Sequence, residues 1–545
     1  MLGLMQQQPL MISNLLRHAA RHHGDAQVVS RNDDRTIHRT TWREVERRAR
    51  RLVNALKALG VQDQDRIGTL AWNNHRHLEV YYAVPGMQAI CHTINPRLHP
   101  DDIAYIINHA GDTVLFVDQS FAALVQSLAQ AVSGTVRAVV MLCEPAAMPA
   151  INLPDGMALH CYDTLLEAAA EDYDWPWFDE NTASALCYTS GTTGRPKGVL
   201  YSHRSTILHA YAACMPDVLC LRASGCVLPV VPMFHVNAWS IPYSAAFTGT
   251  KLVLPGRHLD GASLAELLNA EQVTLTCGVP TVWLGLLQHL RASGERLHTV
   301  QCIMTGGSAA PPLLIEAFRD EYGIAVAHGW GMTELSPIGT YNAPKPAQAG
   351  LTGADAVRHM LKQGRILPGI DMKIVDGEGR ELPWDGVAFG DLMVRGPWVA
   401  SAYFGEDPGS ALDKDGWFAT GDVATIDPDG FMEITDRSKD VIKSGGEWIS
   451  SITLENIAVS HPDVAEAAVI AARHAKWDER PLLLVVPRPG HTIDPDSVLK
   501  VYEGQVAKWW LPDAVVVVPE LPHTATGKLQ KTTLRTQYRD HLLQI

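Results

Sequence analysis

The glycine- and hydroxyl-rich stretch at residues 188–198 is the densest set of chemically useful side chains in the sequence. Its eleven positions hold three glycines, four serine or threonine residues and one lysine, directly after the apolar run at residues 185–187. Such a loop can direct backbone N–H groups and hydroxyls at phosphate oxygens, while Lys197 supplies a mobile positive charge. The composition therefore predicts a site for nucleotide phosphates, with a flexible surface loop as the simpler alternative.

Other nucleotide and hydrolase motifs do not fit the sequence. Counted from Gly191, Pro196 stands where a Walker A loop needs its second glycine, and Gly198 stands where it needs serine or threonine. Gly377 and Gly379 begin no Rossmann fingerprint and predict only a turn. The sequence also contains no GxSxG elbow, which argues against a hydrolase.

Two further segments suit the wall of a substrate pocket. His235 and Trp239 are four residues apart, so on a helix they would share one face. A buried core histidine beside a core tryptophan is their structural alternative. Gly306, Gly307 and Ser308 follow a predicted strand, and the missing side chains would let an acyl chain pass close to the backbone.

Residues 188–198 resemble the phosphate loop of the adenylate-forming superfamily, which includes acyl-CoA synthetases, peptide-synthetase adenylation domains and beetle luciferases. Further segments resemble the other motifs of this family in the same order. They are residues 231–239 beside the acyl pocket, 329–334 for adenine and Mg²⁺, 420–422 for ribose, 436–440 for the hinge and 522–528 for the catalytic lysine. Together these motifs span residues 188–528, so the resemblance covers most of the chain.

The resemblance implies a role for each motif. Lys528 would bridge the substrate carboxylate and the α-phosphate during adenylation, and His235 and Trp239 would wall the carboxylate end of the acyl pocket. Glu334 and Thr189 would hold Mg²⁺, which prefers oxygen ligands. The remaining residues implied to bind the nucleotide are Ser190, Gly191, Thr192, Thr193, Gly194, Lys197, Gly329, Trp330, Gly331, Met332, Thr333, Asp422 and Arg437.

Some of these roles have structural alternatives. Glu334 follows Thr333 and would also suit a helix N-terminus. Asp422 would hydrogen-bond the ribose hydroxyls by resemblance, yet alone it would be a turn or cap residue. Trp330 would stack on adenine, or belong to the core.

The second half-reaction needs a thiol to approach where Lys528 stands during adenylation. A small domain that swings about a hinge can serve both steps. The resemblance puts the pivot at Lys439 and implies that Lys443 then enters the catalytic site. Gly445 and Gly446 would help to build the CoA channel, and Trp448 matches the gate tryptophan of fatty acid ligases.

These residues predict an enzyme that joins a short- to medium-chain apolar carboxylic acid to coenzyme A, using ATP and Mg²⁺. Residues 443–451 look most like bacterial medium- and long-chain fatty acid–CoA ligases. Residues 71–74 and 91–97 are similar to medium-chain ligases and equally to methylmercaptopropionate–CoA ligases, so 3-methylmercaptopropionate is the alternative substrate. An aryl–CoA ligase and a non-catalytic nucleotide- or acyl-binding protein are remoter alternatives. By resemblance we also expect a homodimer.

The elements that must position these residues alternate between strands and helices, which predicts an α/β fold with largely parallel sheets. We expect a large N-terminal domain of several subdomains at residues 1–435, a hinge at 436–441 and a small mobile α+β domain at 442–545. The pattern predicts strands at 66–72, 113–118 and 251–254 and helices at 42–59, 312–322 and 497–510, among others.

The composition of the chain indicates which classes of partner and which cellular location to expect. The net charge is −14 and no block of five basic residues occurs, which argues against a nucleic-acid partner. No apolar run is long enough to span a bilayer, and residues 1–16 do not resemble a secretory signal, so we expect a cytoplasmic protein. The nine cysteines form no CxxC pair and predict buried thiols rather than metal ligands.

Overall fold

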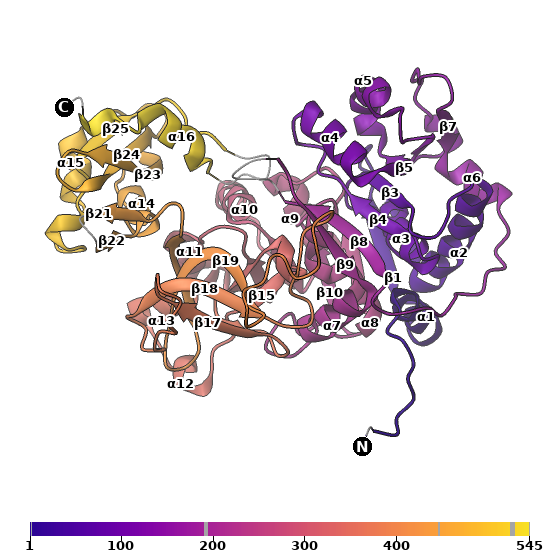
Figure 1. Ribbon diagram of the computed structural model, residues 1–545, viewed down its shortest axis with the longest axis horizontal. Helices are drawn as coiled ribbons and strands as arrows, with labels where there is room; N and C mark the ends of the chain where they lie inside the picture. The colour runs from indigo at the N-terminus through magenta and orange to yellow at the C-terminus, as the bar shows by residue number, and fades with distance from the viewer. Residues whose placement is uncertain (2, 190–194, 445–446, 524–528, 544–545) are drawn as a thin grey trace. The chain divides into compact units, whose positions relative to one another are not determined.

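The chain divides into two compact units in the computed structural model (Figure 1). The structure describes residues 1, 3–189, 195–444, 447–523 and 529–543. One unit, called here the large unit, contains residues 1–189, 195–371 and 395–418, and the small unit contains residues 372–394 and 419–545. The division predicted from sequence, with a hinge at residues 436–441, stays a prediction.

A nine-stranded sheet in the large unit has the strand order β16-β15-β14-β13-β12-β10-β11-β1-β2. The strands from β14 to β1 run parallel, and β2, β15 and β16 pair antiparallel at the edges. The bounds are β1 Gln27–Arg31, β2 Ile37–Thr41, β10 Cys226–Pro229, β11 Lys251–Leu254, β12 Leu275–Gly278, β13 Cys302–Thr305, β14 Ala325–Gly331, β15 Ile338–Tyr341 and β16 Arg365–Ile366.

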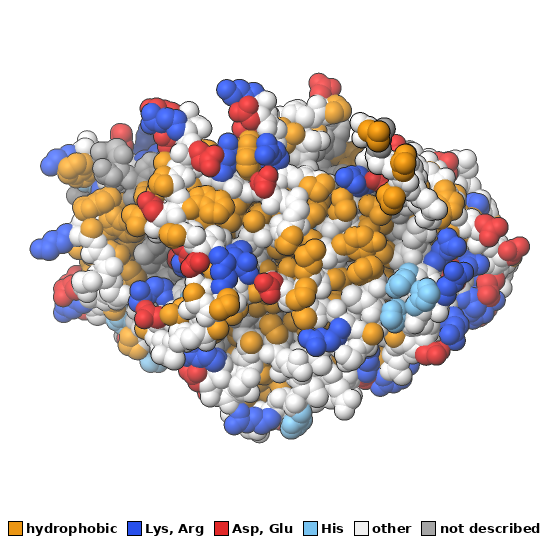
Figure 2. All heavy atoms as spheres, turned by 90° about the horizontal axis from the view of Figure 1, so that it is seen from below, with side chains coloured by type: hydrophobic (Ala, Val, Ile, Leu, Met, Phe, Trp, Pro, Cys, Tyr) orange, Lys and Arg blue, Asp and Glu red, His pale blue; other side chains and the backbone are white. Residues whose placement is uncertain are grey.

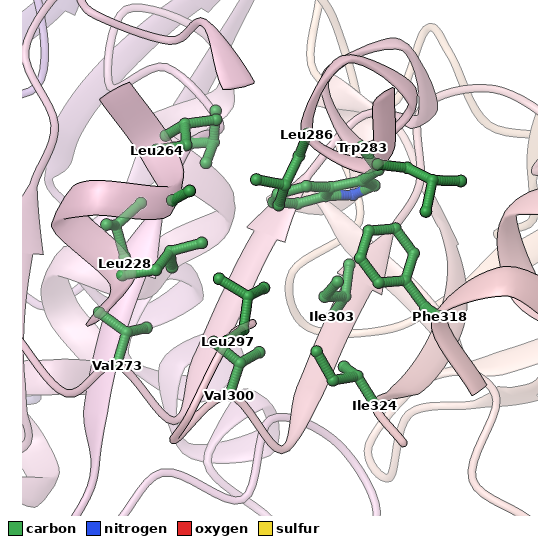
Figure 3. Close-up of a cluster of buried hydrophobic side chains, with 14 of the residues drawn as sticks. Leu228, Leu264, Val273, Trp283, Leu286, Leu297, Val300, Ile303, Phe318 and Ile324 are labelled. Atoms are coloured by element: carbon green, nitrogen blue, oxygen red, sulfur yellow. The ribbon is translucent and has the colours of Figure 1, made fainter. Parts of the chain in front are cut away.

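Three helices cover one face of this sheet: α9 (Gly261–Ala270), α10 (Pro280–Ser293) and α11 (Pro312–Tyr322). Trp283 and Phe318 from α10 and α11 meet Ile303 of β13 in a core whose members are buried (Figure 3). Each fully buried large apolar side chain contributes about 1.5–3 kcal/mol. This core fixes one face of β13 and β14 and leaves the other face available for a pocket.

A seven-stranded sheet forms the second layer of the large unit, in the order β7-β6-β5-β3-β4-β8-β9. Its strands run parallel except for β9, which returns antiparallel beside β8. The strands are β3 Arg66–Leu70, β4 Ile90–Thr93, β5 Asp112–Val117, β6 Ala138–Met141, β7 Ala158–Cys161, β8 Ala183–Tyr188 and β9 Gly198–Ser202. The helices α4 (Pro100–Ala110) and α5 (Ala122–Val132) pack their apolar residues on this sheet.

Five further helices of the large unit lie around these sheets. They are α1 Ile12–His22, α2 Trp42–Ala58, α3 His75–Gly86, α7 His203–Ala213 and α8 Ile241–Thr248. Several begin with a side-chain cap; for example, Thr41 accepts a hydrogen bond from the Glu44 N–H at the start of α2.

The small unit contains two sheets. A four-stranded sheet joins β17 (Asp371–Val375), β18 (Phe389–Arg395), β19 (Phe418–Ile426) and β20 (Met432–Arg437). A second sheet has the order β22-β21-β24-β23, with β25 parallel to β24. Its elements are β21 Ile442–Ser444, β22 Glu447–Ile449, α14 Ser451–Val459, β23 Val464–His474, β24 Asp478–Pro487, α15 Pro495–Lys500, β25 Ala514–Val517 and α16 Lys531–Tyr538.

The predicted fold class, α/β with a small α+β C-terminal part, is confirmed. The predicted strand at 251–254 and helix at 312–322 match β11 and α11 end to end. The predicted helix at 497–510 is wrong, because α15 ends at Lys500 and Gly504 adopts a left-handed φ of 74°. Apolar residues keep a helical spacing across this turn, so periodicity alone could not detect the break.

Within the described ranges, no helix combines the length and apolar character needed to cross a membrane. On the face shown in Figure 2, basic, acidic and apolar side chains are interspersed. All nine cysteines are free thiols, five of them buried.

Candidate functional site

The hairpin of β8 and β9 presents both ends of the predicted phosphate loop. Its register pairs Tyr188 with Gly198. Just beyond, the Thr189 N–H donates to the Lys197 carbonyl at 2.9 Å, and the Lys197 N–H donates to Thr189 Oγ1 at 3.4 Å. Thr189 and Lys197 therefore face each other across the loop. The predicted phosphate ligands Ser190, Gly191, Thr192, Thr193 and Gly194 lie outside the described residues.

Tyr403 connects the loop lysine to the predicted metal ligand. Its hydroxyl donates to Glu334 Oε1 at 2.8 Å, and the Lys197 ammonium lies 4.4 Å from the centroid of its ring. Lys197 also pairs with Glu406 at 3.4 Å. Burial and the nearby Glu334 carboxylate raise the pKa of Tyr403. The structure thus brings together a cation and a carboxylate that are 137 positions apart in the sequence numbering, from Lys197 to Glu334.

The segment that carries Glu334 is fixed through its backbone. The Tyr201 hydroxyl donates to the Thr333 carbonyl at 2.6 Å, and the Ala400 N–H donates to the Glu334 carbonyl at 2.8 Å. A Cβ on Gly331 would lie 2.2 Å from the Pro337 carbonyl oxygen, so the close approach of these two strands requires glycine. The Glu334 side chain is buried within the short 3₁₀ turn at Thr333–Leu335.

Other residues of this motif take ordinary positions in the strand and turn. Gly329, Trp330 and Gly331 end β14, and Met332 donates its backbone N–H to the Pro337 carbonyl at 3.1 Å. Trp330 is buried and its ring lies against Gly339. The stacking of Trp330 on adenine stays a prediction.

The donor set fits a Mg²⁺ ion that arrives with nucleotide phosphates. Mg²⁺ is commonly bound by one or two protein carboxylates plus phosphate and water. Glu334 supplies one buried carboxylate, and Thr189 is a candidate hydroxyl. Across the described parts of the chain, no group of three or more His, Cys, Asp and Glu residues is arranged to hold a metal alone.

Residues 236–240, which directly follow His235, form a left-handed turn in place of a right-handed helix. All five residues have left-handed backbone angles, with φ between 43° and 65°. A right-handed helix is therefore absent here, and the shared position of His235 and Trp239 in the pocket wall stays a prediction. Trp239 is buried and its ring faces Gly306, where a Cβ would lie 3.3 Å from Trp239 Cη2.

Asn73 holds the segment that leads into this turn, and the sequence analysis did not single it out. Its buried amide donates to the Pro229 and Val231 carbonyls at 3.0 and 2.9 Å and accepts the Met233 N–H at 2.6 Å. Asn73 lies inside the segment 71–74 that carried part of the family resemblance. The resemblance of residues 71–74 to family members could have drawn attention to Asn73.

Small residues line the free face of β13 and β14. Alternation places Cys302, Met304 and Gly306 on one face of β13, and Ala327 and Gly329 on one face of β14. A Cβ on Gly306 would lie 2.9 Å from the Gly329 carbonyl oxygen. Gly307 and Ser308 follow before α11, and Gly307 has a left-handed φ of 82°. The predicted glycine-lined wall therefore lies against Trp239.

A cavity of ≈ 450 Å³ lies at the opposite end of the same strands. Its lining includes Cys302, Ala325, Ala327 and Tyr341, together with residues 218–222. Met304 follows Cys302, a residue of the cavity lining, on the same face of β13 and precedes Gly306. Its side chain lies against β14, because a Cβ on Gly329 would lie 2.8 Å from Met304 Cε. The strand face thus leads from Trp239, past Met304, to a partly open cavity whose lining is mainly apolar.

In the small unit, Asp422 and Arg437 are paired across β19 and β20. The Arg437 Nε lies 3.3 Å from Asp422 Oδ1, and the Asp422 N–H donates to Thr420 Oγ1 at 3.1 Å. Asp422 is buried, while Arg437 is about half exposed. The two residues predicted to bind ribose are neighbours, and their role toward ribose stays a prediction.

The predicted pivot Lys439 lies just after β20, with Ser438 between them. Burial lowers the pKa of the Lys439 ammonium, which lies near Arg437 and Arg535. The Lys439 carbonyl accepts a hydrogen bond from Arg535 at 3.3 Å, and Arg535 pairs with Asp440. Lys443 is exposed on β21 opposite Trp448 of β22. Lys528, Gly445 and Gly446 lie outside the described residues.

A buried ionic cluster lies beside the pivot in the small unit. Lys531 at the start of α16 pairs with Glu455 of α14 at 2.6 Å and donates to Ser451 Oγ at 2.6 Å. Ser451 Oγ donates in turn to Asp436 Oδ1 at 3.0 Å. Burial raises the pKa of both Glu455 and Asp436, although the Lys531 charge opposes this shift.

Comparison with known proteins relates the whole chain to one group. A family profile described as AMP-binding enzyme matches residues 16–404, and one described as AMP-binding enzyme C-terminal domain matches residues 453–528. The chain is 52% identical to 3-methylmercaptopropionyl-CoA ligase of Ruegeria lacuscaerulensis, covering 99% of this chain and 100% of that protein. It is 51% identical to medium-chain-fatty-acid–CoA ligase of Ectopseudomonas oleovorans, covering 100% and 99% respectively. The crystal structure of ATP-bound MatB from Rhodopseudomonas palustris superposes with a TM-score of 0.81, at 26% identity over 97% of this chain and 99% of that one.

Proposed function

The chain belongs to the AMP-binding enzyme family, and from that premise we propose that it is an ATP-dependent acid–CoA ligase. The observation that carries the proposal is the assembly of Lys197, Tyr403 and Glu334 at the phosphate loop. It offers a mobile cation for phosphate and a buried carboxylate for Mg²⁺ within one short network. Full-length similarity to acid–CoA ligases supports the same chemistry.

The reaction needs activation because a carboxylate has no adequate leaving group. Attack of the carboxylate on the α-phosphate of ATP releases pyrophosphate and gives an acyl-adenylate, from which the CoA thiol displaces AMP. The attack brings two anions together, so cations and oriented dipoles must stabilise it. Lys197 would act on the β- and γ-phosphates. Glu334, with Thr189, would hold Mg²⁺, which neutralises phosphate charge.

Lys528 and Lys443 are proposed to serve the two half-reactions in turn, through rotation of the small domain about Lys439. Gly445 and Gly446 would then help to build the CoA channel, and Trp448 would serve as its gate tryptophan. Asp422 and Arg437 would bind the ribose. Lys528→Ala should abolish pyrophosphate release and still allow thioester formation from supplied acyl-adenylate. Equal loss of both half-reactions would contradict the two-position scheme.

A medium-chain fatty acid is the proposed substrate. The support is the apolar cavity behind Met304, because an acid that ends at the glycine wall would leave it unused. The strand distance from Gly306 to Cys302 is roughly 13 Å at about 3.3 Å per residue, which suits a chain longer than a few carbons. 3-Methylmercaptopropionate is the second candidate substrate, because this chain is 52% identical to the 3-methylmercaptopropionyl-CoA ligase of Ruegeria lacuscaerulensis.

Release of AMP and pyrophosphate with ATP, Mg²⁺ and CoA tests the proposal. The panel contains acetate, butyrate, 3-methylmercaptopropionate, hexanoate, octanoate, palmitate and benzoate. We expect the highest kcat/KM with hexanoate or octanoate. A preference for 3-methylmercaptopropionate would select the second candidate, and no ATP consumption with any acid would refute the ligase assignment. Omission of Mg²⁺ and sizing of the purified protein test the proposed metal and homodimer, and cell fractionation tests the cytoplasmic location.

A further inference from the structure

We propose that Tyr403 is a positioning residue that sets the affinity for MgATP by holding Lys197 and Glu334 at a fixed separation. The inference rests on the proposed function, since it assumes that these two residues meet the nucleotide and its metal. Tyr403 acts through them and needs no contact with the reacting atoms.

The two ends of the tyrosine hold different partners. Its hydroxyl donates to Glu334 Oε1 at 2.8 Å, which orients the carboxylate. Its ring face attracts the Lys197 ammonium at 4.4 Å. A phenylalanine would keep the ring contact and lose the hydroxyl contact, so the two effects can be separated.

Tyr403 is itself fixed by the segment that carries it. On one side, the Ala400 N–H donates to the Glu334 carbonyl at 2.8 Å. On the other, the Phe404 N–H donates to the Gly198 carbonyl at 2.8 Å, next to Lys197. The backbone around Tyr403 is therefore tied to both of the segments whose side chains it joins, and the tyrosine cannot shift without disturbing them.

Lys197 needs such a restraint more than Glu334 does. Its side chain is 56% exposed, and its ion pair with Glu406, which is 42% exposed, is screened by solvent. A long exposed lysine loses rotamer freedom when it is ordered. The tyrosine ring restricts Lys197 before the nucleotide arrives, so less ordering remains to be done on binding.

The test compares Tyr403→Phe and Tyr403→Leu with Tyr322→Phe, a control at a half-buried tyrosine of α11. We measure the Mg²⁺ concentration for half-maximal pyrophosphate release, the KM for ATP and the KM for octanoate. Tyr403→Phe should raise the Mg²⁺ requirement roughly tenfold, the effect expected for losing a hydrogen bond to a charged group. Tyr403→Leu should also raise the KM for ATP several-fold. The octanoate KM and the thermal midpoint of Tyr403→Phe should match the control.

An unchanged Mg²⁺ requirement in Tyr403→Phe would overturn the inference. Equal changes in every parameter with a lowered thermal midpoint would also overturn it, since they would show a purely structural role. If the parent protein consumes no ATP with any acid, the proposed function fails. Calorimetric titration with MgATP then still tests the inference, because weaker MgATP binding by Tyr403→Phe is expected whatever the acid.

Discussion

Lys197 of the large unit and Lys531 of the small unit both pair with carboxylates, but in opposite surroundings. The Lys197 side chain is 56% exposed and the Lys531 side chain is 9% exposed. Lys197 has an aromatic ring and an exposed carboxylate as neighbours, whereas Lys531 has Glu455 and the Ser451 hydroxyl within 2.6 Å. The first cluster is open to solvent and the second is enclosed by protein.

The difference in exposure decides whether a charged side chain can exchange one partner for another. An exposed ion pair contributes little stability, so Lys197 can leave Glu406 for a phosphate at small cost. A buried charge must keep its partners, because removing one leaves the others desolvated and uncompensated. The open cluster therefore suits ligand binding, and the enclosed cluster ties α14 and α16 to the end of β20, next to the predicted pivot.

The largest expected effect comes from breaking the enclosed cluster. Lys531→Met should lower the free energy of unfolding of the small unit by about 3–5 kcal/mol, because Glu455 and Asp436 lose their buried cation. Denaturant unfolding followed by hydrogen exchange in β23 and β24 measures this loss. Lys197→Met is the matched control and should change stability by less than about 0.5 kcal/mol. Equal destabilisation by both variants would remove the distinction between the clusters.

The next effect concerns the chemistry of the open cluster. Lys197→Met should slow pyrophosphate release by roughly 10²–10³-fold, the cost typical of removing one group that stabilises transition-state charge. Thioester formation from supplied acyl-adenylate should fall much less, since pyrophosphate has already left. Stopped-flow assays of the two half-reactions check this. A comparable loss in both would show that Lys197 acts elsewhere than on the departing phosphates.

The smallest effect is a pH dependence confined to the enclosed cluster. Burial raises the folded-state pKa of Glu455 and Asp436, so the folded state binds protons more tightly than the unfolded state. Unfolding free energy should therefore fall as pH rises from about 4, the unfolded value, through the raised folded values. Glu455→Gln should make this fall shallower by no more than about 1.4 kcal/mol per pH unit.

Glu406→Gln provides the comparison for that measurement, because Glu406 belongs to the open cluster and is 42% exposed. Its stability profile between pH 4.5 and 7.5 should follow that of the parent protein. A steeper change in Glu406→Gln than in Glu455→Gln would contradict the assignment of the pH dependence to the enclosed carboxylates.

Helices could be predicted from the sequence where one face is apolar and residues typical of helix ends stand at both termini. An example is α11, which begins at Pro312 and is followed by Gly323. Local composition also predicted the phosphate loop. Tyr403 escaped detection because a single tyrosine has no local signature; its role arises from two partners that only the tertiary fold brings near. The four-residue spacing of His235 and Trp239 did not indicate the left-handed turn at residues 236–240, because spacing does not reveal the hand of a turn.

The turn at residues 236–240 has a chemical consequence of its own. L-residues disfavour left-handed angles by roughly 1–2 kcal/mol each, whereas D-residues prefer them. A D-alanine introduced at Ala238 by semisynthesis would favour the observed φ of 48°, and its methyl group would take the direction of the present Hα. In this turn beside the glycine wall, a D-amino acid would therefore suit the backbone conformation better than the natural L-residue.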